Sequence, residues 1–230
     1  MASSYDTKLV NPRPEIEETT VAKFRELYDV LSISCVVSDS MDRANTMDCG
    51  IVPRGADKKI IGPAITVKLR PGDIVDCLEV FTVVKAGDVI VIDAFGEKTT
   101  SIWGGLMTGI ARNAGVVGAV IDGSCRDTDE SRMLGFPVHS RWVNPRAAHT
   151  ASTQRKTPIE INVPVTCGGI TVNPGDLVVA DEIGVAVVPY ANLAAVYERA
   201  KDQAEKAAAA RQDILAGMGV DGLLKKYGRI

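Results

Sequence analysis

The chain has 230 residues, 46% of them apolar and only 5% aromatic, so it can bury a core built from Val, Ile, Leu and Ala. The formal net charge is −3 and Lys and Arg form no cluster, which argues against a nucleic-acid or anionic-membrane partner. The opening residues lack a basic segment followed by an apolar one, and no apolar run reaches the roughly eighteen residues of a membrane-spanning helix, so we expect a cytoplasmic protein.

The first part of the chain predicts an arm and two helices. Residues 1–15 are polar and contain proline, so we expect an arm that becomes ordered only against the rest of the chain or a neighbour. Over residues 16–33, apolar side chains recur at helical spacing: Val21, Phe24, Leu27 and Leu31. In "VSDSMDRA", Ser38 or Asp39 is a candidate N-cap for a short second helix.

Residues 59–93 contain short Val/Ile runs bounded by turn residues, in "KIIGPAITVKL", "RPGDIV" and "KAGDVIVIDAFG". This pattern predicts several β-strands. The segment "GDVIVIDAFG" at 87–96 resembles "GDLVVADEIG" at 175–184, since each places Gly-Asp before an apolar run and an acid and a glycine after it. Two copies are too few for a solenoid, so we interpret them as one turn chemistry used twice.

Between these two copies the sequence predicts the second half of a β-α-β unit. A helix is expected to open at Gly104–Gly105 and to close near Gly115, followed by a strand at 116–122. From Pro189 the chain is Ala-rich, and one long helix is expected with an apolar stripe that often packs on another subunit. The stripe consists of Leu193, Val196, Tyr197, Ala200, Ala204, Ile214 and Leu215. We therefore expect one domain, with a core over 16–190 and a helical extension over 191–230.

The strongest candidate for a binding site joins Gly104–Gly105 to the pair Arg126 and Asp127. A helix N-terminus presents unpaired N–H groups, here those of Leu106 and Met107, and glycines let an anion approach them. Loops after the carboxyl ends of strands in an open α/β layer usually line the ligand crevice, so Arg126 and Asp127 would face the same amides. An anion would then meet amides, a guanidinium and a metal held by Asp127.

The alternative is that nothing binds at this position. The two glycines would then serve tight packing, and Arg126 would pair with Asp129 or Glu130 on the surface. On residue types alone this second interpretation is the commoner outcome, because Gly-Gly and Arg-Asp pairs occur in many proteins. The spacings G-x-G-x-x-G and G-x-x-x-x-G-K-[ST] are both absent, which leaves nucleotide binding with little support.

Other polar residues give weaker signals. His139 and His149 have no Cys or acid at ligand spacing, so structural or surface roles are expected. Five scattered cysteines without a C-x-x-C pair predict neither a disulfide framework nor a zinc site, and we expect Cys125 to be a packed thiol despite its arginine neighbour. Asp93 and Glu97 either line the crevice or cap a turn.

The assembled motifs resemble the family of the regulator of ribonuclease activity A (RraA) and the 4-hydroxy-4-methyl-2-oxoglutarate aldolases, which are class II, metal-dependent pyruvate aldolases. The matching segments lie within about residues 35–190: "SDSMDR", "GPAITVK", "GDVIVIDAFG", "WGGLMTGIARNAGVVGAVIDGSCRDTDE", "LGFPVHSRWVNPRAA" and "VNPGDLVVADEIGVAVVP". The resemblance implies an α/β fold, the swivelling β/β/α domain with α-β-β-α layers, a helical N-terminal segment and a long C-terminal helix. It also implies a homotrimer or homohexamer with sites between subunits.

The resemblance also implies roles for the candidate residues. Asp127 would anchor Mg²⁺ or Mn²⁺, Arg126 would contact the pyruvyl group, and the amides of Leu106 and Met107, after the glycine loop Gly104–Gly105, would hold the pyruvate carboxylate. We favour a ligand crevice over the alternative in which nothing binds, and this preference rests on the resemblance.

One position departs from part of the family. Some members carry an acid twenty-one positions before the arginine, where this sequence has Gly105. Other aldolases match G-x20-R-D-x2-E/D, which fits Gly105, Arg126, Asp127 and Glu130, so Glu130 is expected to supply the missing carboxylate and to act catalytically with Arg126. An acid from a neighbouring subunit's C-terminal region also takes part in the family, and we assign no residue to it.

The function implied is a lyase that cleaves a 4-hydroxy-2-oxo acid to pyruvate, with oxaloacetate decarboxylase activity. The substrate would be 4-hydroxy-4-methyl-2-oxoglutarate or 4-carboxy-4-hydroxy-2-oxoadipate. Two alternatives remain open at this point: a protein-binding regulator of a ribonuclease, and an enzyme acting on another 2-oxo acid or sugar acid.

Overall fold

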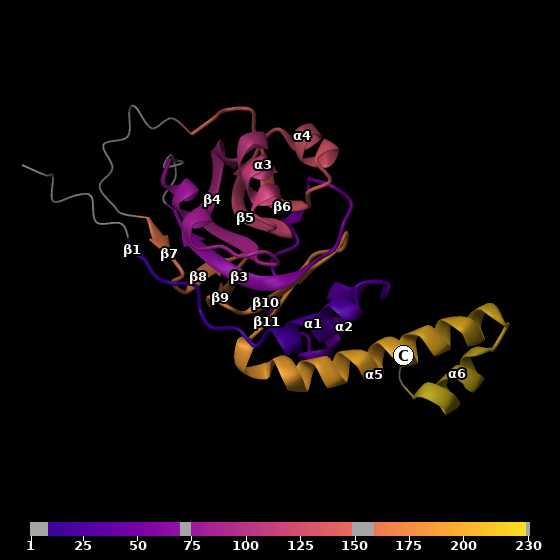
Figure 1. The fold of residues 1–230 in the computed structure, drawn as a ribbon. Helices are drawn as coiled ribbons and strands as arrows, with labels where there is room; N and C mark the ends of the chain where they lie inside the picture. Colours follow the sequence, from indigo (N-terminus) through magenta and orange to yellow (C-terminus); the bar gives the residue numbers. More distant parts are fainter. Residues whose placement is uncertain (1–8, 70–74, 149–158, 229–230) are drawn as a thin grey trace, which may run out of the picture.

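The computed structural model describes residues 9–69, 75–148 and 159–228 (Figure 1). The helices are α1 (Glu18–Glu26), α2 (Ile33–Ser40), α3 (Gly105–Asn113), α4 (Thr128–Met133), α5 (Leu193–Leu215) and α6 (Val220–Tyr227), with 3-10 helices η1 (Val75–Thr82) and η2 (Tyr190–Asn192). The strands are β1 (Leu9–Val10), β2 (Val52–Pro53), β3 (Ile60–Lys68), β4 (Val89–Trp103), β5 (Gly118–Cys125), β6 (Val138–Val143), β7 (Glu160–Ile161), β8 (Val165–Cys167), β9 (Ile170–Val172), β10 (Leu177–Ala180) and β11 (Val185–Val188).

Two strand layers share one strand. β3, β4, β5 and β6 form a parallel sheet in that order, with the short strands β7 and then β1 beyond β3, and β2 beyond β6. The first half of β3, residues 60–63, pairs instead with β10, which continues to β11 in an antiparallel layer. Because β3 passes from one layer into the other, the two sheets stack on each other.

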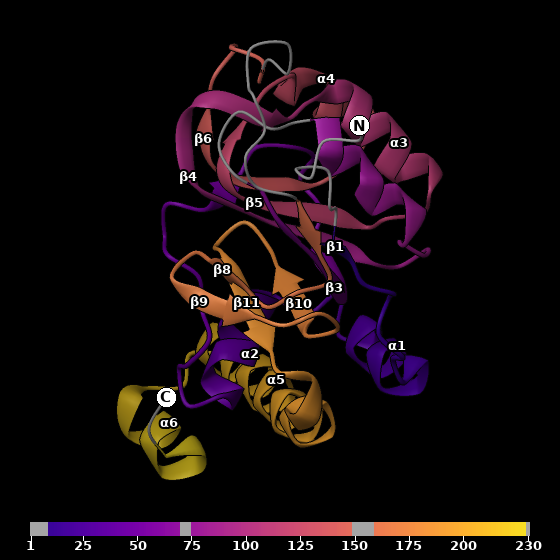
Figure 2. The same ribbon diagram turned by 90° about the vertical axis from the view of Figure 1, so that its left-hand side faces the viewer.

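Four layers result, as Figure 2 shows from top to bottom: α3 with α4, the parallel sheet, the β8–β11 layer, and α1, α2 and α5. The strands alternate between cores as their period of two requires. Ile90 and Ile92 of β4 face the core under α3, whereas Val89 and Val91 face the core between the sheets. A third core lies between β10–β11 and the helices below them. The expected α-β-β-α layering is therefore confirmed.

The two similar segments form the same turn. Gly87 and Gly175 have φ values of 92° and 89°, a region open mainly to glycine. The aspartate after each glycine, Asp88 or Asp176, accepts the backbone N–H three residues before it at 2.8 Å. The acid that follows each apolar run, Asp93 or Asp181, accepts the N–H two residues further on at 3.0 Å. One turn chemistry used twice explains the sequence similarity, as predicted.

The expectations for the N-terminal helices were partly wrong. α1 ends at Glu26, and Leu31 is 63% exposed rather than buried. Ser38 and Asp39 lie in the last turn of α2, which begins after Ser32 and not at a Ser38 or Asp39 cap. The apolar residues before Ser38 pack against β11 and α5, and this burial outweighs the local capping signal.

A second correction concerns residues 70–82. The expected strand in "RPGDIV" falls mostly on residues outside the described ranges, and residues 75–82 form the 3-10 helix η1 rather than a strand. Cys77 and Val80 of η1 are buried in the core between α3 and the parallel sheet. Short apolar runs do not distinguish a strand from a buried helical turn, which is why the pattern misled.

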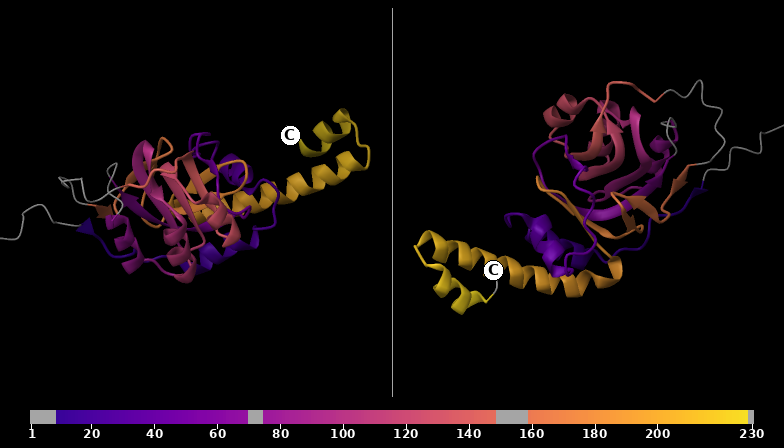
Figure 3. Two further views of the ribbon diagram at one scale, coloured as in Figure 1. Left: turned by 90° about the horizontal axis from the view of Figure 1, so that it is seen from above. Right: turned by 180° about the vertical axis from the view of Figure 1, so that it is seen from behind.

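The long C-terminal helix is present, and its two halves differ. The first part of α5 covers α1 and α2, burying Leu193, Val196 and Ala200. Beyond this, α5 extends past the body of the domain and α6 folds back beside it (Figure 3). Ile214 and Leu215 at the far end are 50% and 88% exposed, so this part of the stripe is not covered by the chain itself. No helix in the described ranges combines the length and apolarity needed to cross a bilayer.

Candidate functional site

The N-terminus of α3 follows directly from the end of β4. Gly104 is the N-cap, with an extended backbone, and α3 begins at Gly105. The N–H of Gly105 donates to Asp127 Oδ2 at 3.0 Å. Within the part of the chain that the structure describes, the N–H groups of Leu106 and Met107 have no acceptor. Two amides at the positive end of the helix dipole are therefore available to an anion.

Arg126 and Asp127 form a tight turn against this helix end. The N–H of Arg126 donates to the carbonyl of Trp103 at 2.9 Å, which fixes the turn to the end of β4. Asp127 is the N-cap of α4 and has a φ of 52°, a left-handed conformation that aspartate tolerates better than most residues. Arg126 Nε lies 3.4 Å from Asp127 Oδ2, and the two side chains are 36% and 41% exposed. Both remain accessible to a ligand.

Glu130 lies directly over Gly105. A Cβ added at Gly105 would lie 1.8 Å from Glu130 Oε2, and one added at Gly104 would lie 2.9 Å from Asp127 Oδ2. Each glycine thus leaves the space that an acid from α4 or its cap occupies. The structure brings Gly104–Gly105, Arg126, Asp127 and Glu130 together, and Arg126 pairs with Asp127 rather than with Glu130 or a more distant acid.

The two residues expected to offer amides differ in their side chains. Leu106 is 82% exposed beside the site, whereas Met107 is buried in the core under α3. Only the backbone N–H of Met107 faces the ligand side. The exposed Leu106 gives this end of α3 an apolar surface next to the charged pair.

Beneath the site lies a buried polar network that the sequence analysis did not single out. It joins Trp103, Thr108 and Ser131, which are 0%, 0% and 2% exposed. A signal was present in the spacing, because Thr108 and Ser131 each lie four residues after the N-cap of a helix. Hydroxyl residues at that position commonly bond back to the carbonyl four residues earlier.

The weaker candidates have structural roles. Glu97 accepts the N–H groups of the two following threonines, and Asp93 that of Phe95, so both cap turns. Asp93 also lines a separate hollow of about 340 Å³ with Lys68 and Asp122. Burial, reinforced by the nearby charge of Asp122, raises the pKa of Asp93. Asp122 itself accepts Arg141 Nε at 2.6 Å.

The remaining candidates are buried or outside the described residues. Cys125 packs with its thiol 3.0 Å from Ser140 Oγ, and burial raises its pKa, as expected for an unreactive thiol. Cys77 and Cys167 are also buried, whereas the other two cysteines are exposed. His149 lies outside the described residues.

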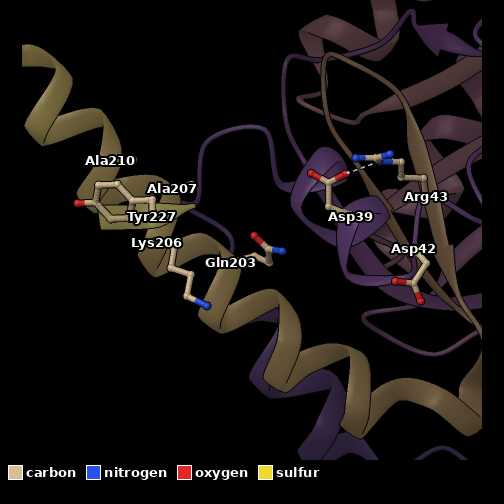
Figure 4. A pocket seen from close by; sticks show the side chains of 8 residues that line it. All are labelled: Asp39, Asp42, Arg43, Gln203, Lys206, Ala207, Ala210 and Tyr227. Carbon is tan, nitrogen blue, oxygen red and sulfur yellow. Dashed lines mark ion pairs between the residues drawn. The ribbon is translucent and has the colours of Figure 1, made fainter. Parts of the chain in front are cut away.

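A second hollow, of about 520 Å³, lies between α2, α5 and α6 (Figure 4). It is lined by none of the candidate site residues on α3 and α4. Asp39 and Arg43 of its α2 side pair with each other at 3.9 Å. Lys206 and Tyr227 of its other side bond to acids of α5 at 2.6 Å. These charges are satisfied within the chain, and the hollow lacks the free amides found at α3.

His139 is a buried structural residue of β6. Its Nε2 lies 2.9 Å from the carbonyl of Asp181, so Nε2 carries the proton, and Nδ1 has no partner in the described structure. Burial lowers the pKa of His139 from its ordinary 6.5, although the Asp181 carbonyl opposes this. Protonation of Nδ1 would place a charge where nothing accepts it.

We therefore expect the free energy of unfolding to decrease as the pH falls below about 6.5, because the unfolded chain then binds a proton that the folded chain resists. The slope from this residue is at most about 1.4 kcal/mol per pH unit. His139→Gln retains an N–H for the Asp181 carbonyl and cannot titrate. Urea unfolding from about pH 5 to 7.5 should give a flatter profile for the variant, and parallel profiles would contradict this explanation.

The fold and the site define a class of protein, a layered α/β domain in which a glycine-initiated helix N-terminus faces an Arg–Asp turn. Within this class the chain belongs to the RraA-like family, described as Aldolase/RraA, whose model matches residues 34–187. These residues include the whole candidate site.

Individual relatives agree. A protein of Halalkalibacterium halodurans, provisionally named a 4-hydroxy-4-methyl-2-oxoglutarate aldolase, is 38% identical over 175 residues, 76% of this chain and 80% of that protein. The crystal structure of an uncharacterized protein from Pseudomonas syringae pv. tomato has a TM-score of 0.73 at 29% identity, covering 92% of this chain and 98% of that chain. RraAS2 of Streptomyces coelicolor, described as an unusual member of the RNase ES inhibitor RraA protein family, has a TM-score of 0.72 at 27% identity, covering 86% and 99%.

Proposed function

We propose that the protein is a divalent-metal-dependent lyase that cleaves a 4-hydroxy-2-oxo acid to pyruvate and decarboxylates oxaloacetate. The substrate class is that of 4-hydroxy-4-methyl-2-oxoglutarate and 4-carboxy-4-hydroxy-2-oxoadipate. One observation carries the proposal: the Arg126–Asp127 turn lies against the free N-terminus of α3, with Glu130 over Gly105. The aldolase name of the relative in Halalkalibacterium halodurans supports the same chemistry.

The residues present fit Mg²⁺ or Mn²⁺. Such hard cations take oxygen ligands, and Mg²⁺ is commonly held by one or two carboxylates, with water and substrate completing its shell. Asp127 would hold the ion through Oδ1, which has no hydrogen bond in the described structure, while the Glu130 carboxylate lies over the adjacent Gly105 and is left to act as a base. The described residues contain no cluster of three or more His, Cys, Asp or Glu suited to a metal. When bound, the ion would act as a Lewis acid toward the 2-oxo acid.

The chain's own groups would bind and orient the substrate. The N–H groups of Leu106 and Met107 would donate to the carboxylate of the 2-oxo acid. Arg126 would stabilise the negative charge that develops on the keto oxygen as the C–C bond breaks, and preorganised charge of this kind is commonly the largest catalytic contribution. Glu130 would accept the proton of the C4 hydroxyl, so that pyruvate leaves as its enolate and is then protonated. Loss of carbon dioxide from oxaloacetate forms the same enolate.

A single chain leaves the site open, and we propose a cytoplasmic homotrimer or homohexamer in which a neighbouring subunit encloses it. Large apolar side chains are exposed on α3 and α4, the two helices whose first residues form the site. Leu106, Ile110 and Met133 are 82%, 42% and 78% exposed. Exposed apolar groups on neighbouring helices favour a protein interface.

A second candidate function is regulation of a ribonuclease by surface contact, supported by the description of RraAS2 in Streptomyces coelicolor. Such a role requires no free helix amides and no carboxylate pair. The assembled site therefore favours the lyase, and a lyase of the same kind acting on another 2-oxo or sugar acid is the nearer alternative.

The test is pyruvate release from 4-hydroxy-4-methyl-2-oxoglutarate and from oxaloacetate after treatment with EDTA. We expect turnover to be lost on chelation and restored by Mg²⁺ or Mn²⁺. Absence of turnover of both compounds with either metal present would contradict the proposal and shift the question to other 2-oxo acids and to protein partners.

A further inference from the structure

The network beneath the site has two matching halves. Thr108 lies one turn into α3, and its Oγ1 bonds to the carbonyl of the N-cap Gly104 at 3.1 Å. Ser131 lies one turn into α4, and its Oγ bonds to the carbonyl of the N-cap Asp127 at 3.3 Å. The two hydroxyl oxygens are 3.1 Å apart. The helix starts that build the site are thus linked through a pair of hydroxyls.

Trp103 completes the link. Its indole Nε1 donates to Thr108 Oγ1 at 2.9 Å, and its carbonyl accepts the N–H of Arg126 at 2.9 Å. The indole is fully buried and stacks on Phe136, with ring centroids 6.2 Å apart. A rigid aromatic residue therefore contacts both the backbone of the Arg–Asp turn and the hydroxyl pair.

The network has fewer protons than hydrogen-bonding contacts. Two hydroxyls and one indole N–H supply three protons for four close contacts, so one hydroxyl proton is shared between two acceptors. Water cannot replace a lost partner here, because Thr108 and Ser131 are 0% and 2% exposed. Removal of the Thr108 hydroxyl leaves the buried indole N–H of Trp103 without an acceptor, and the structure must shift to relieve it. Removal of the Ser131 hydroxyl takes away the contact that joins the two helix starts.

We propose that Thr108, together with Ser131 and Trp103, is a positioning residue that sets the separation between the α3 amides and Asp127. The hydrogen bond from the Gly105 N–H to Asp127 Oδ2, 3.0 Å long, measures that separation in this structure. The catalytic consequence rests on the proposed function, whereas the structural one does not. Loss of the Thr108 hydroxyl would let the two helix starts move apart, and small misplacements of catalytic groups cost large factors in rate.

The test compares Thr108→Val with Thr108→Ser, which keeps the hydroxyl, and with Thr66→Val. Thr66 is a matched control, since it is equally buried and its Oγ1 also bonds to a carbonyl, that of Val163, but on β3 and outside the site. Ser131→Ala removes the other hydroxyl by a smaller change. Two properties are measured in the full-length protein: kcat and KM for oxaloacetate with Mg²⁺, and hydrogen exchange of the Gly105 amide by NMR.

We expect Thr108→Val and Ser131→Ala to lower kcat about tenfold or more and to speed exchange of the Gly105 amide. Thr108→Ser should retain the wild-type kcat and the wild-type exchange rate of the Gly105 amide, and Thr66→Val should change neither quantity. Unchanged Gly105 exchange in folded Thr108→Val and Ser131→Ala, relative to Thr66→Val, would overturn the positioning role. If the wild-type protein has no lyase activity, the proposed function fails, and the exchange measurement still decides this inference.

Discussion

Asp127→Asn should lower kcat/KM for oxaloacetate by about 10²–10³-fold, a loss of roughly 3–4 kcal/mol of transition-state stabilisation. The substitution removes one negative charge and preserves shape. Asparagine tolerates the left-handed φ of 52° at this position, serves as an N-cap, and can still accept the Gly105 N–H. We therefore expect a change of less than about 1 kcal/mol in the free energy of unfolding.

Asp129→Asn is the matched control. It removes one negative charge from the first turn of α4, at an exposed residue with no hydrogen bond or ion pair to the site in the described structure. Activity, thermal unfolding and Mn²⁺ binding by calorimetry are measured for both variants. The metal assignment predicts weak Mn²⁺ binding in Asp127→Asn alone. Equal activity and equal Mn²⁺ affinity in the two variants would remove Asp127 from the metal site.

The layers of the fold could be predicted because each strand shows its two faces in the sequence. In "VIVID", alternate residues enter different cores, and a strand buried on both faces leaves a continuous apolar run. The position of α2 could not be predicted in the same way. Its start depends on burial of Val36 and Val37 against β11 and α5, which lie about 150 residues away in the chain.

The candidate site was likewise predictable only in part. Arg126 and Asp127 could be identified because they directly follow a buried strand, and Gly104–Gly105 because they open a helix. What the sequence could not show is that Thr108 of one helix meets Ser131 of another at 3.1 Å. Local patterns predicted most of the elements, though not η1 or the start of α2, and contacts between elements depend on how the elements pack.

Gly105→Ala should also cause a large loss of turnover, because the substitution displaces Glu130 and not because it disturbs the backbone. The new Cβ would lie 1.8 Å from Glu130 Oε2 and 2.3 Å from its Cδ, so the carboxylate must leave its position. The end of a glutamate side chain moves readily, and alanine suits the first turn of a helix, so the protein should remain folded. We expect turnover to fall about 10²-fold or more, the range for loss of a positioned general base, and Glu130→Gln to show a similar loss.

Gly109→Ala in the same helix is the control, because its added Cβ would meet no atom within 4 Å. That variant should retain activity and gain up to about 1 kcal/mol of stability from the better helix former. Wild-type turnover in Gly105→Ala would show that Glu130 takes no part in catalysis.

The double variant Gly105→Asp with Glu130→Gly moves the carboxylate from α4 to α3. If residues 105 and 130 are alternative origins for one carboxylate in the same space, this exchange should recover much of the activity that Gly105→Ala loses.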